Sequence, residues 1–142
     1  MYRILLPVDI DETRTERIAS AVVDVFGDRD DVAVTILNVF EEFEVTDESD
    51  MVRSADLYDE TSFPDSVDTA TEILSAADFE VEKRREHGEP AERIIAVADE
   101  IDADIIAMGG RKRRPSGKVL FGSVLQSVLL STDRPVFAEM GE

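Results

Sequence analysis

Residues 105–123 read IIAMGGRKRRPSGKVLFGS and carry the clearest fold signal in this chain. The apolar run 105–108 has the pattern of a buried parallel strand, and an amphipathic run begins at Gly122 and Ser123. Between them lies a glycine-containing loop with five cations, in a protein whose net charge is -18. Because the first N–H groups of a helix are unpaired and its dipole is positive there, this order of elements predicts an anion site. Phosphate is the first ligand to consider.

Strand and helix patterns alternate along the rest of the chain. Such alternation is typical of a parallel sheet that is covered by helices on both faces. We therefore predict an α/β fold, a doubly wound open five-stranded parallel sheet with four helices. The predicted strands are residues 3–8, 32–39, 79–85, 105–108 and 136–140. Polar alternation in residues 79–85 predicts a strand at the sheet edge.

Capping residues and apolar periodicity place the helices between these strands. Thr13 and Glu16 predict a capping box that opens the first helix, and Gly27 ends it. The second helix is predicted to start at Pro64, and the third at Pro90. The predicted buried faces are Ile18, Ala21, Val22, Val25 and Phe26; Val67, Ala70, Leu74 and Ala77; Ala91, Ile94, Ile95, Ala98 and Ile101; and Phe121, Val124, Leu125, Val128 and Leu129. Residues 40–63 are acidic without a clear period, and we expect them to be the most mobile region.

Composition narrows the class of protein. The 142 residues are the size of one domain, so we predict a single domain over residues 1–142. The chain contains no cysteine and one histidine, His87, which excludes disulfides and thiolate metal sites. We predict no metal-ligating residue in the protein itself. No apolar run approaches the length needed to span a bilayer, so we expect a cytoplasmic protein with no membrane partner.

The charge balance is strongly acidic. Acidic residues outnumber basic ones 33 to 15, which argues against a nucleic-acid partner because duplex binding needs an extended basic face. Dense acidity also suits a protein from a high-salt environment, where screening over about 3 Å at 1 M relieves self-repulsion. A halophilic source is therefore one interpretation, and an acidic protein of ordinary salinity is the other.

The predicted fold places the ligand site. In an open doubly wound sheet, ligands bind beyond the carboxyl ends of the strands, where the strand order reverses. The segments expected to meet there are residues 7–11, residues 38–40 and the basic loop after residue 108. A carboxylate such as that of Asp9 accepts from a ribose hydroxyl or a base amino group, while the basic loop holds phosphates. Together these segments predict a nucleotide site.

At this point the chain resembles the universal stress protein family along essentially its whole length. The family's phosphate motif is Gly, two residues, Gly, nine residues, then Gly followed by Ser or Thr. Gly109 matches the first position and Gly122 with Ser123 match the last two, while Met108 matches the hydrophobic residue before the loop. Lys112 stands where the motif has its second glycine, and a side chain there carries a steric cost if the backbone needs a positive φ.

Other segments extend the resemblance. Pro7, Val8 and Asp9 match the end of the first strand, where members of the family that bind ATP contact the adenosine end. Val39 matches the adenine-facing position that ends the second strand, and residues 88–90 match a Gly-x-Pro turn before the third helix. The cofactor-binding residues that the resemblance implies are Pro7, Val8, Asp9, Val39, Met108, Gly109, Arg111, Gly122, Ser123 and Val124.

The resemblance implies an adenine-nucleotide-binding regulatory module in stress response, with the adenine-nucleotide alpha hydrolase-like fold. It implies ATP with Mg²⁺ as cofactors and a homodimer that pairs through the C-terminal strand, with any hydrolysis slow and no catalytic residue assigned. The alternative is a dimeric interaction or scaffold protein without nucleotide, whose basic loop binds an anion or an acidic partner. An enzyme of nucleotidyl or phosphoryl transfer is a third interpretation, for which no catalytic residue stands out.

Simpler roles stay open for individual residues. Asp9 is also suited to a turn or a helix cap, and Ser123 to an ordinary N-cap. The cations Arg111 and Arg114, with those between them, also suit a solvated turn. Acidic residues in the long segment, Asp47, Glu48 and Asp50, could weakly hold a hard cation.

Overall fold

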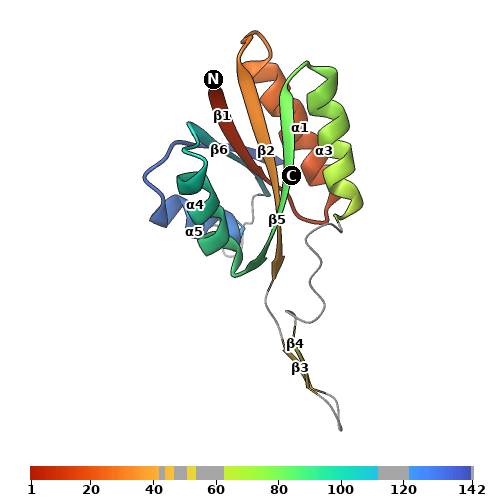
Figure 1. Cartoon of the computed structure of the whole chain (residues 1–142), viewed down its shortest axis with the longest axis vertical. Coiled ribbons are helices and arrows are strands. Elements are labelled where there is room, and N and C mark those ends of the chain that lie inside the picture. The colour runs from red at the N-terminus through yellow and green to blue at the C-terminus, as the bar shows by residue number, and fades with distance from the viewer. Residues whose placement is uncertain (42–43, 47–50, 54–62, 112–121, 142) are drawn as a thin grey trace, which may run out of the picture.

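A computed structural model describes residues 1–41, 44–46, 51–53, 63–111 and 122–141 (Figure 1). The strands of the main sheet alternate with helices along the chain, as the sequence predicts, and all five strands are parallel. Its strands are β1 (Tyr2–Pro7), β2 (Val32–Glu41), β5 (Glu80–Gly88), β6 (Ile105–Arg111) and β7 (Val136–Gly141). The described helices are α1 (Glu12–Phe26), α3 (Asp65–Ala76), α4 (Pro90–Glu100) and α5 (Ser123–Ser131).

The strand order of the main sheet is β5-β2-β1-β6-β7, so the chain reverses its direction of growth between β1 and β6. β1 pairs with β2 over its whole length, from Tyr2 to Pro7. In contrast, β1 pairs with β6 only where Ile4 and Leu5 face Ile105 and Ile106. The two central strands therefore separate toward their carboxyl ends, which is where a doubly wound sheet binds ligands.

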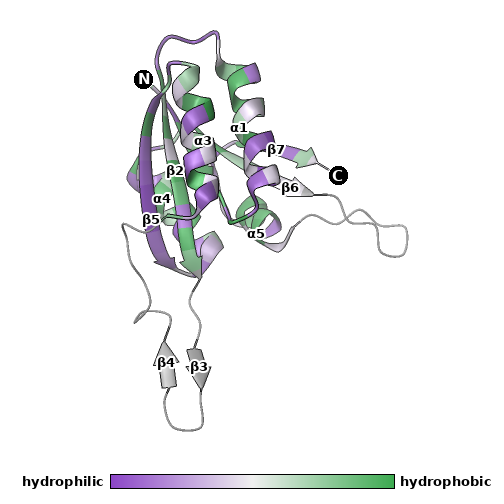
Figure 2. Cartoon of the chain, turned by 90° about the vertical axis from the view of Figure 1, so that its right-hand side faces the viewer, coloured by the Kyte–Doolittle hydropathy of each residue, from purple (hydrophilic) through white to green (hydrophobic). Residues whose placement is uncertain are grey.

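Each face of the sheet has its own hydrophobic core, and this confirms the predicted doubly wound fold. Ile4 and Leu6 of β1 pack with α1 and α3, whereas Leu5 between them packs with α4 and α5. Side chains of one strand alternate between faces, so a strand covered on both sides is apolar without interruption. Figures 1 and 2 show the two helix pairs on opposite sides of the sheet.

The ends of the helices follow local chemistry, with one correction to the sequence analysis. Asp11, and not Thr13, is the N-cap of α1, and its carboxylate accepts the N–H of Arg14 at 3.0 Å. The predicted capping box of Thr13 and Glu16 is wrong because α1 begins at Glu12, so Thr13 already lies inside the helix that the box was to open. The end of α1 predicted at Gly27 is confirmed, as are the starts of α3 and α4 predicted at Pro64 and Pro90.

Two apolar residues that the periodicity assigns to buried faces are exposed. Val25 is 56% exposed and Leu129 is 42% exposed. The buried residues of α1 are Thr15, Ile18, Ala19 and Val22, and those of α5 are Leu125 and Val128, so the buried stripe is narrower than the periodicity predicts. Phe121, which was predicted to be buried, lies outside the described residues.

The acidic segment after β2 contains regular structure that its sequence pattern does not predict. β3 (Glu44–Thr46) pairs antiparallel with β4 (Met51–Arg53) as a separate two-stranded sheet. Figures 1 and 2 show this pair beyond the end of β2, away from the main sheet. Strands of three residues are too short for a period to be read from them, which explains why the prediction missed the pair. Asp47, Glu48 and Asp50 lie outside the described residues.

Candidate functional site

A cavity of about 390 Å³ opens where β1 and β6 separate. Its volume falls within the range of small-molecule sites in proteins. Nine of the ten residues that the sequence predicts for the site line it: Pro7, Val8, Asp9, Val39, Met108, Gly109, Gly122, Ser123 and Val124. The tenth, Arg111, ends β6, and its side chain lies outside the described part of the chain, as does all of Lys112. Further lining residues not predicted are Arg14, Thr15, Ile18, Leu37, Pro90, Ile94, Gly110 and Leu125.

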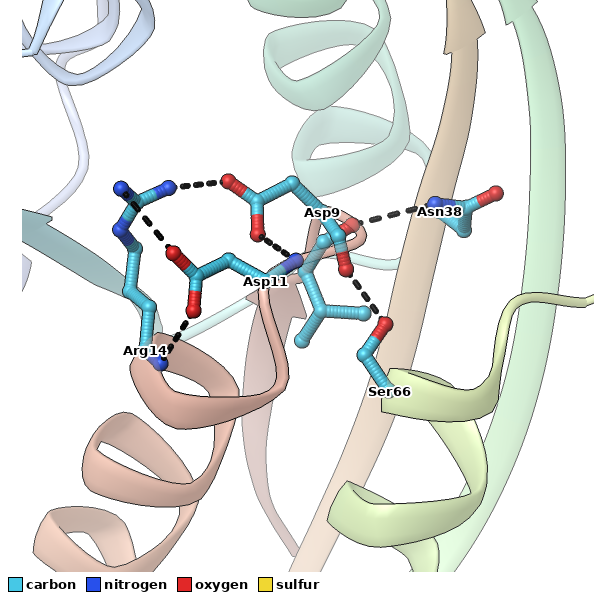
Figure 3. A network of polar contacts seen from close by, with 6 residues as sticks. Asp9, Asp11, Arg14, Asn38 and Ser66 are labelled. Atoms are coloured by element: carbon cyan, nitrogen blue, oxygen red, sulfur yellow. Dashed lines mark hydrogen bonds and ion pairs between the residues drawn. The ribbon is translucent and has the colours of Figure 1, made fainter.

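The loop after β1 is held from three sides (Figure 3). The side-chain amide of Asn38, in the second half of β2, donates to the carbonyl oxygen of Val8 at 3.2 Å. The hydroxyl of Ser66, in the first turn of α3, donates to the carbonyl oxygen of Asp9. The N–H of Asp11 donates to Oδ1 of Asp9 at 2.9 Å. These bonds orient the Asp9 carboxylate before any ligand arrives, and a preorganised group binds with a smaller entropic cost.

Arg14 is the most important lining residue that sequence reasoning missed. Its Nη1 forms an ion pair with Oδ2 of Asp9, and its Nη2 lies 3.6 Å from Oδ2 of Asp11 (Figure 3). The N–H of Arg14 donates to Asp11 and its guanidinium attracts the same carboxylate, and together they hold the pKa of Asp11 below its usual range. No sequence signal identifies this role, because an arginine in the first turn of a helix looks like a solvated residue.

Apolar and glycine residues of the wall come from different elements. β2 and α4 contribute Leu37, Val39, Pro90 and Ile94, and β6 contributes the buried Met108. Such side chains suit the faces of a planar aromatic ring.

The turn before α4 is built by Gly88, which has a φ of +141°, and by Glu89, whose carboxylate accepts the N–H of Glu92 at 2.7 Å.

Glycine residues form another part of the cavity wall and bring the backbone close to the cavity there. Gly122 is the N-cap of α5, so the alternative assignment of Ser123 as the cap is wrong. A Cβ added to Gly122 meets no described atom within 4 Å, which leaves the start of α5 open. The N–H groups of the first helical turn have no partner within the helix and carry the positive end of its dipole. This wall is therefore suited to an anionic group.

Metal ligation by the protein itself has no support in the part of the chain that is described. Within those residues, no three His, Asp or Glu side chains gather closely enough to hold a metal ion. Among the same residues, no helix is both long enough and apolar enough to cross a bilayer.

A cavity at the switch point of an open parallel sheet is the place where α/β proteins of this architecture commonly bind ligands. Residues 1–138 match the model of the universal stress protein family, and the chain therefore belongs to this family. A region of 47 residues is 43% identical to a universal stress protein of Mycolicibacterium smegmatis. A region of 49 residues is 43% identical to the stress response protein NhaX of Bacillus subtilis. These regions span only 36% and 30% of those two proteins.

Solved structures of the family agree in fold over nearly the whole chain. A universal stress protein from Archaeoglobus fulgidus matches with a TM-score of 0.69 and 27% identity, covering 97% of this chain and 98% of that one. A structure from the same organism in complex with dAMP has a TM-score of 0.67 and 24% identity, covering 97% of each chain. A universal stress protein in complex with cAMP has a TM-score of 0.63 and 16% identity, covering 99% and 98%.

Proposed function

We propose that this universal stress protein binds an adenine nucleotide, ATP with Mg²⁺ in the first instance, and acts as a regulatory module in stress response. The observation that carries the proposal is that Asp9, Val39, Gly109 and Gly122, from four separate elements or their flanking loops, line one and the same cavity. Structural relatives in complex with dAMP and with cAMP support the choice of an adenine nucleotide. The single domain and the cytoplasmic location stay predictions.

The residues divide between the two ends of such a ligand. The exposed carboxylate of Asp9 accepts from ribose or base donors, and Val39 and Met108 contact the apolar base. The backbone at Gly109 and the start of α5 at Gly122 receive the phosphates, as does Arg111 in this proposal. Mg²⁺ would neutralise phosphate charge and arrive with the nucleotide. We propose binding with at most slow hydrolysis.

Ligand-dependent melting tests the proposal. A ligand that binds only the folded state stabilises it by RT ln(1 + [L]/Kd), about 2.7 kcal/mol at a hundredfold excess over Kd. We expect Mg²⁺-ATP to raise the melting temperature and to release or absorb heat in calorimetry, at low salt and in molar KCl. No heat and no shift at millimolar ATP in either salt would remove the nucleotide function and favour the scaffold alternative.

Gly122→Asp places a charge where the phosphates are proposed to lie. Its φ of -60° and ψ of 148° suit any residue, and the new side chain has open space and is a preferred N-cap. We expect this variant to fold at least as stably and to lose ATP affinity at least tenfold. Gly122→Asn is the matched control, since it adds a cap of the same size without charge, and it should keep more of the affinity. Equal affinity of both variants would contradict the assignment of phosphate to this wall.

A homodimer through the edge of β7 completes the proposal. β7 is the last strand in the order of the sheet, so one of its sides has no neighbouring strand among the residues that the structure describes. Unpaired strand edges favour pairing with another chain, and a two-fold axis would place two β7 strands side by side. The same dimer would serve the scaffold alternative.

A further inference from the structure

Arg14 joins the two sides of the proposed nucleotide site. It belongs to the first turn of α1, yet its side chain is only 22% exposed because it lies in the cavity wall. Its aliphatic part covers Gly109 of β6, where an added Cβ would lie 2.7 Å from Cγ of Arg14. A residue other than glycine at this position would collide with the arginine. Arg14 therefore extends from the Asp9 loop to the first glycine of the phosphate motif.

The Asp9 carboxylate is already engaged by protein groups. Oδ1 accepts the N–H of Asp11, and Oδ2 pairs with Arg14. A ribose hydroxyl that approaches Asp9 has to compete with this ion pair for the carboxylate. The competition is a weak one, since Asp9 is 53% exposed and ion pairs open to solvent contribute little.

The Arg14 guanidinium also has a hydrogen-bond donor that is available to a ligand. Nε of Arg14 is buried and finds no hydrogen-bond acceptor among the described residues. A buried donor without an acceptor is unfavourable, so a ligand that supplies one gains affinity there. A phosphate offers several acceptor oxygens and binds a guanidinium in a bidentate manner, with more charge than a single carboxylate.

Resting on the proposed nucleotide function, we propose that Arg14 is a specificity residue that selects phosphorylated nucleosides over free nucleosides. The phosphate nearest the ribose replaces Asp9 as the partner of the Arg14 guanidinium. The released Asp9 carboxylate then accepts a hydrogen bond from a ribose hydroxyl. Because Arg14 pairs directly with Asp9, the phosphate that it binds is the one adjacent to the ribose. AMP, ADP and ATP therefore all use this contact, and adenosine does not.

The test compares Arg14→Gln with Arg17→Gln, which removes the same charge from the same helix but lines no part of this cavity. Kd values for AMP, ADP, ATP and adenosine are measured by calorimetry at equal ionic strength. We expect Arg14→Gln to weaken the three nucleotides by a similar factor of about ten or more, as for a lost charged hydrogen bond. Adenosine should bind as well as before or several-fold more tightly, and Arg17→Gln should change neither.

Other outcomes overturn the proposal. Tighter AMP binding by Arg14→Gln would mean that Arg14 only obstructs the site. Equal weakening of AMP and adenosine would mean that it only positions Asp9. Arg14→Lys keeps the charge but not the bidentate fork, so it should recover part of the AMP affinity, and its melting temperature checks that the site stays folded.

Pyrophosphate separates this proposal from the proposed function. If the unmodified protein binds pyrophosphate and no adenine compound, and Arg14→Gln loses pyrophosphate, then the nucleotide function fails while Arg14 keeps its role as an anion ligand. If the unmodified protein binds both and Arg14→Gln retains the nucleotides in full, then the function holds and the role of Arg14 is refuted.

Discussion

The side-chain amide of Asn38 donates to the carbonyl oxygen of Val8 at 3.2 Å, across the boundary between β2 and the loop that follows β1. Asn38 is only 6% exposed, and it lies within β2 between the apolar residues Leu37 and Val39. The N–H of Val8 donates in turn to the carbonyl oxygen of Leu37 at 2.9 Å. Both polar groups of the Val8 backbone are thus paired to β2, and the chain leaves β1 in one defined direction toward Asp9.

Asn38→Ala should destabilise the fold and weaken ligand binding together. It leaves the buried carbonyl of Val8 without this donor, and a loss of this kind costs about 1–3 kcal/mol. Urea denaturation measures the change in the free energy of unfolding. Gln126→Ala is the control, because Gln126 is an exposed amide on α5 and its loss should stay within about 0.5 kcal/mol. A similarly small change for Asn38→Ala would refute the anchoring role.

Gly109→Ala should be costly only while Arg14 is present. The new Cβ would lie 2.7 Å from Cγ of an arginine whose guanidinium is held by Asp9 and Asp11. Overpacking of this kind costs about 1–3 kcal/mol. In an Arg14→Ala background the same substitution should be nearly neutral, and a double-mutant cycle on the free energy of unfolding measures the coupling. Equal losses in both backgrounds would show that the two residues do not interact.

Acid should abolish the contribution of Asp11 to stability. The N–H of Arg14, first, and then its guanidinium lower the pKa of this carboxyl from its ordinary 3.8 in the folded state. A carboxyl whose folded pKa is depressed contributes stability above its unfolded pKa and loses it as pH falls through the folded value. Asp11→Asn keeps a capping oxygen but cannot titrate. Its deficit in unfolding free energy relative to the unmodified protein should therefore be present at neutral pH and shrink below about pH 4.

A deficit of Asp11→Asn that is the same at pH 3 and pH 7 would contradict this assignment. Asp24→Asn, an exposed position further along α1, is the control for removing one negative charge.

Ala138→Pro should dissociate the proposed dimer without unfolding the subunit. In the parallel pairing of β6 and β7, the N–H of Ile106 donates to the carbonyl oxygen of Pro135 at 3.0 Å. N–H groups along a strand alternate in direction, so that of Ala138 faces the free edge, where proline removes a donor. Phe137→Pro is a poorer choice, because Phe137 packs against the core and its N–H faces β6. Sedimentation velocity in high salt measures the result, and an unmodified protein that is monomeric at tens of micromolar would refute the dimer.

Salt should stabilise the fold if the acidity reflects a halophilic source. A net charge of -18 on 142 residues produces repulsion that molar KCl screens over about 3 Å. We expect the melting temperature to rise from low salt to 2 M KCl. The melting temperature is measured in KCl and in potassium glutamate, so that two different salts are compared. Guanidinium chloride is not used because it denatures proteins. A melting temperature that is flat or falling in both salts would favour an acidic protein of ordinary salinity.

Local patterns in the sequence predict the five-stranded sheet and the edge position of β5, whereas the family resemblance predicts nine of the residues that line the cavity. The sheet follows from local patterns: residues 4–6 of β1 and 105–108 of β6 are apolar runs, and turn residues such as Pro90 mark where a helix begins. Such patterns arise from residues two to four positions apart, whose spacing the backbone geometry dictates. Weaker local signals gave a wrong prediction at Thr13, because Asp11, two positions earlier, provides the N-cap instead.

The contacts that hold the site in place depend on how distant elements pack together, and no local pattern predicts them. Ser66 reaches Asp9 from 57 positions away, and Asn38 reaches Val8 from 30. Arg14 lies over Gly109 because α1 packs beside β6. No periodicity encodes these contacts, since each depends on how two separately formed elements come together. The physical reason is that sequence patterns report which face of an element is buried, whereas the partner of a polar side chain depends on the packing of the whole chain.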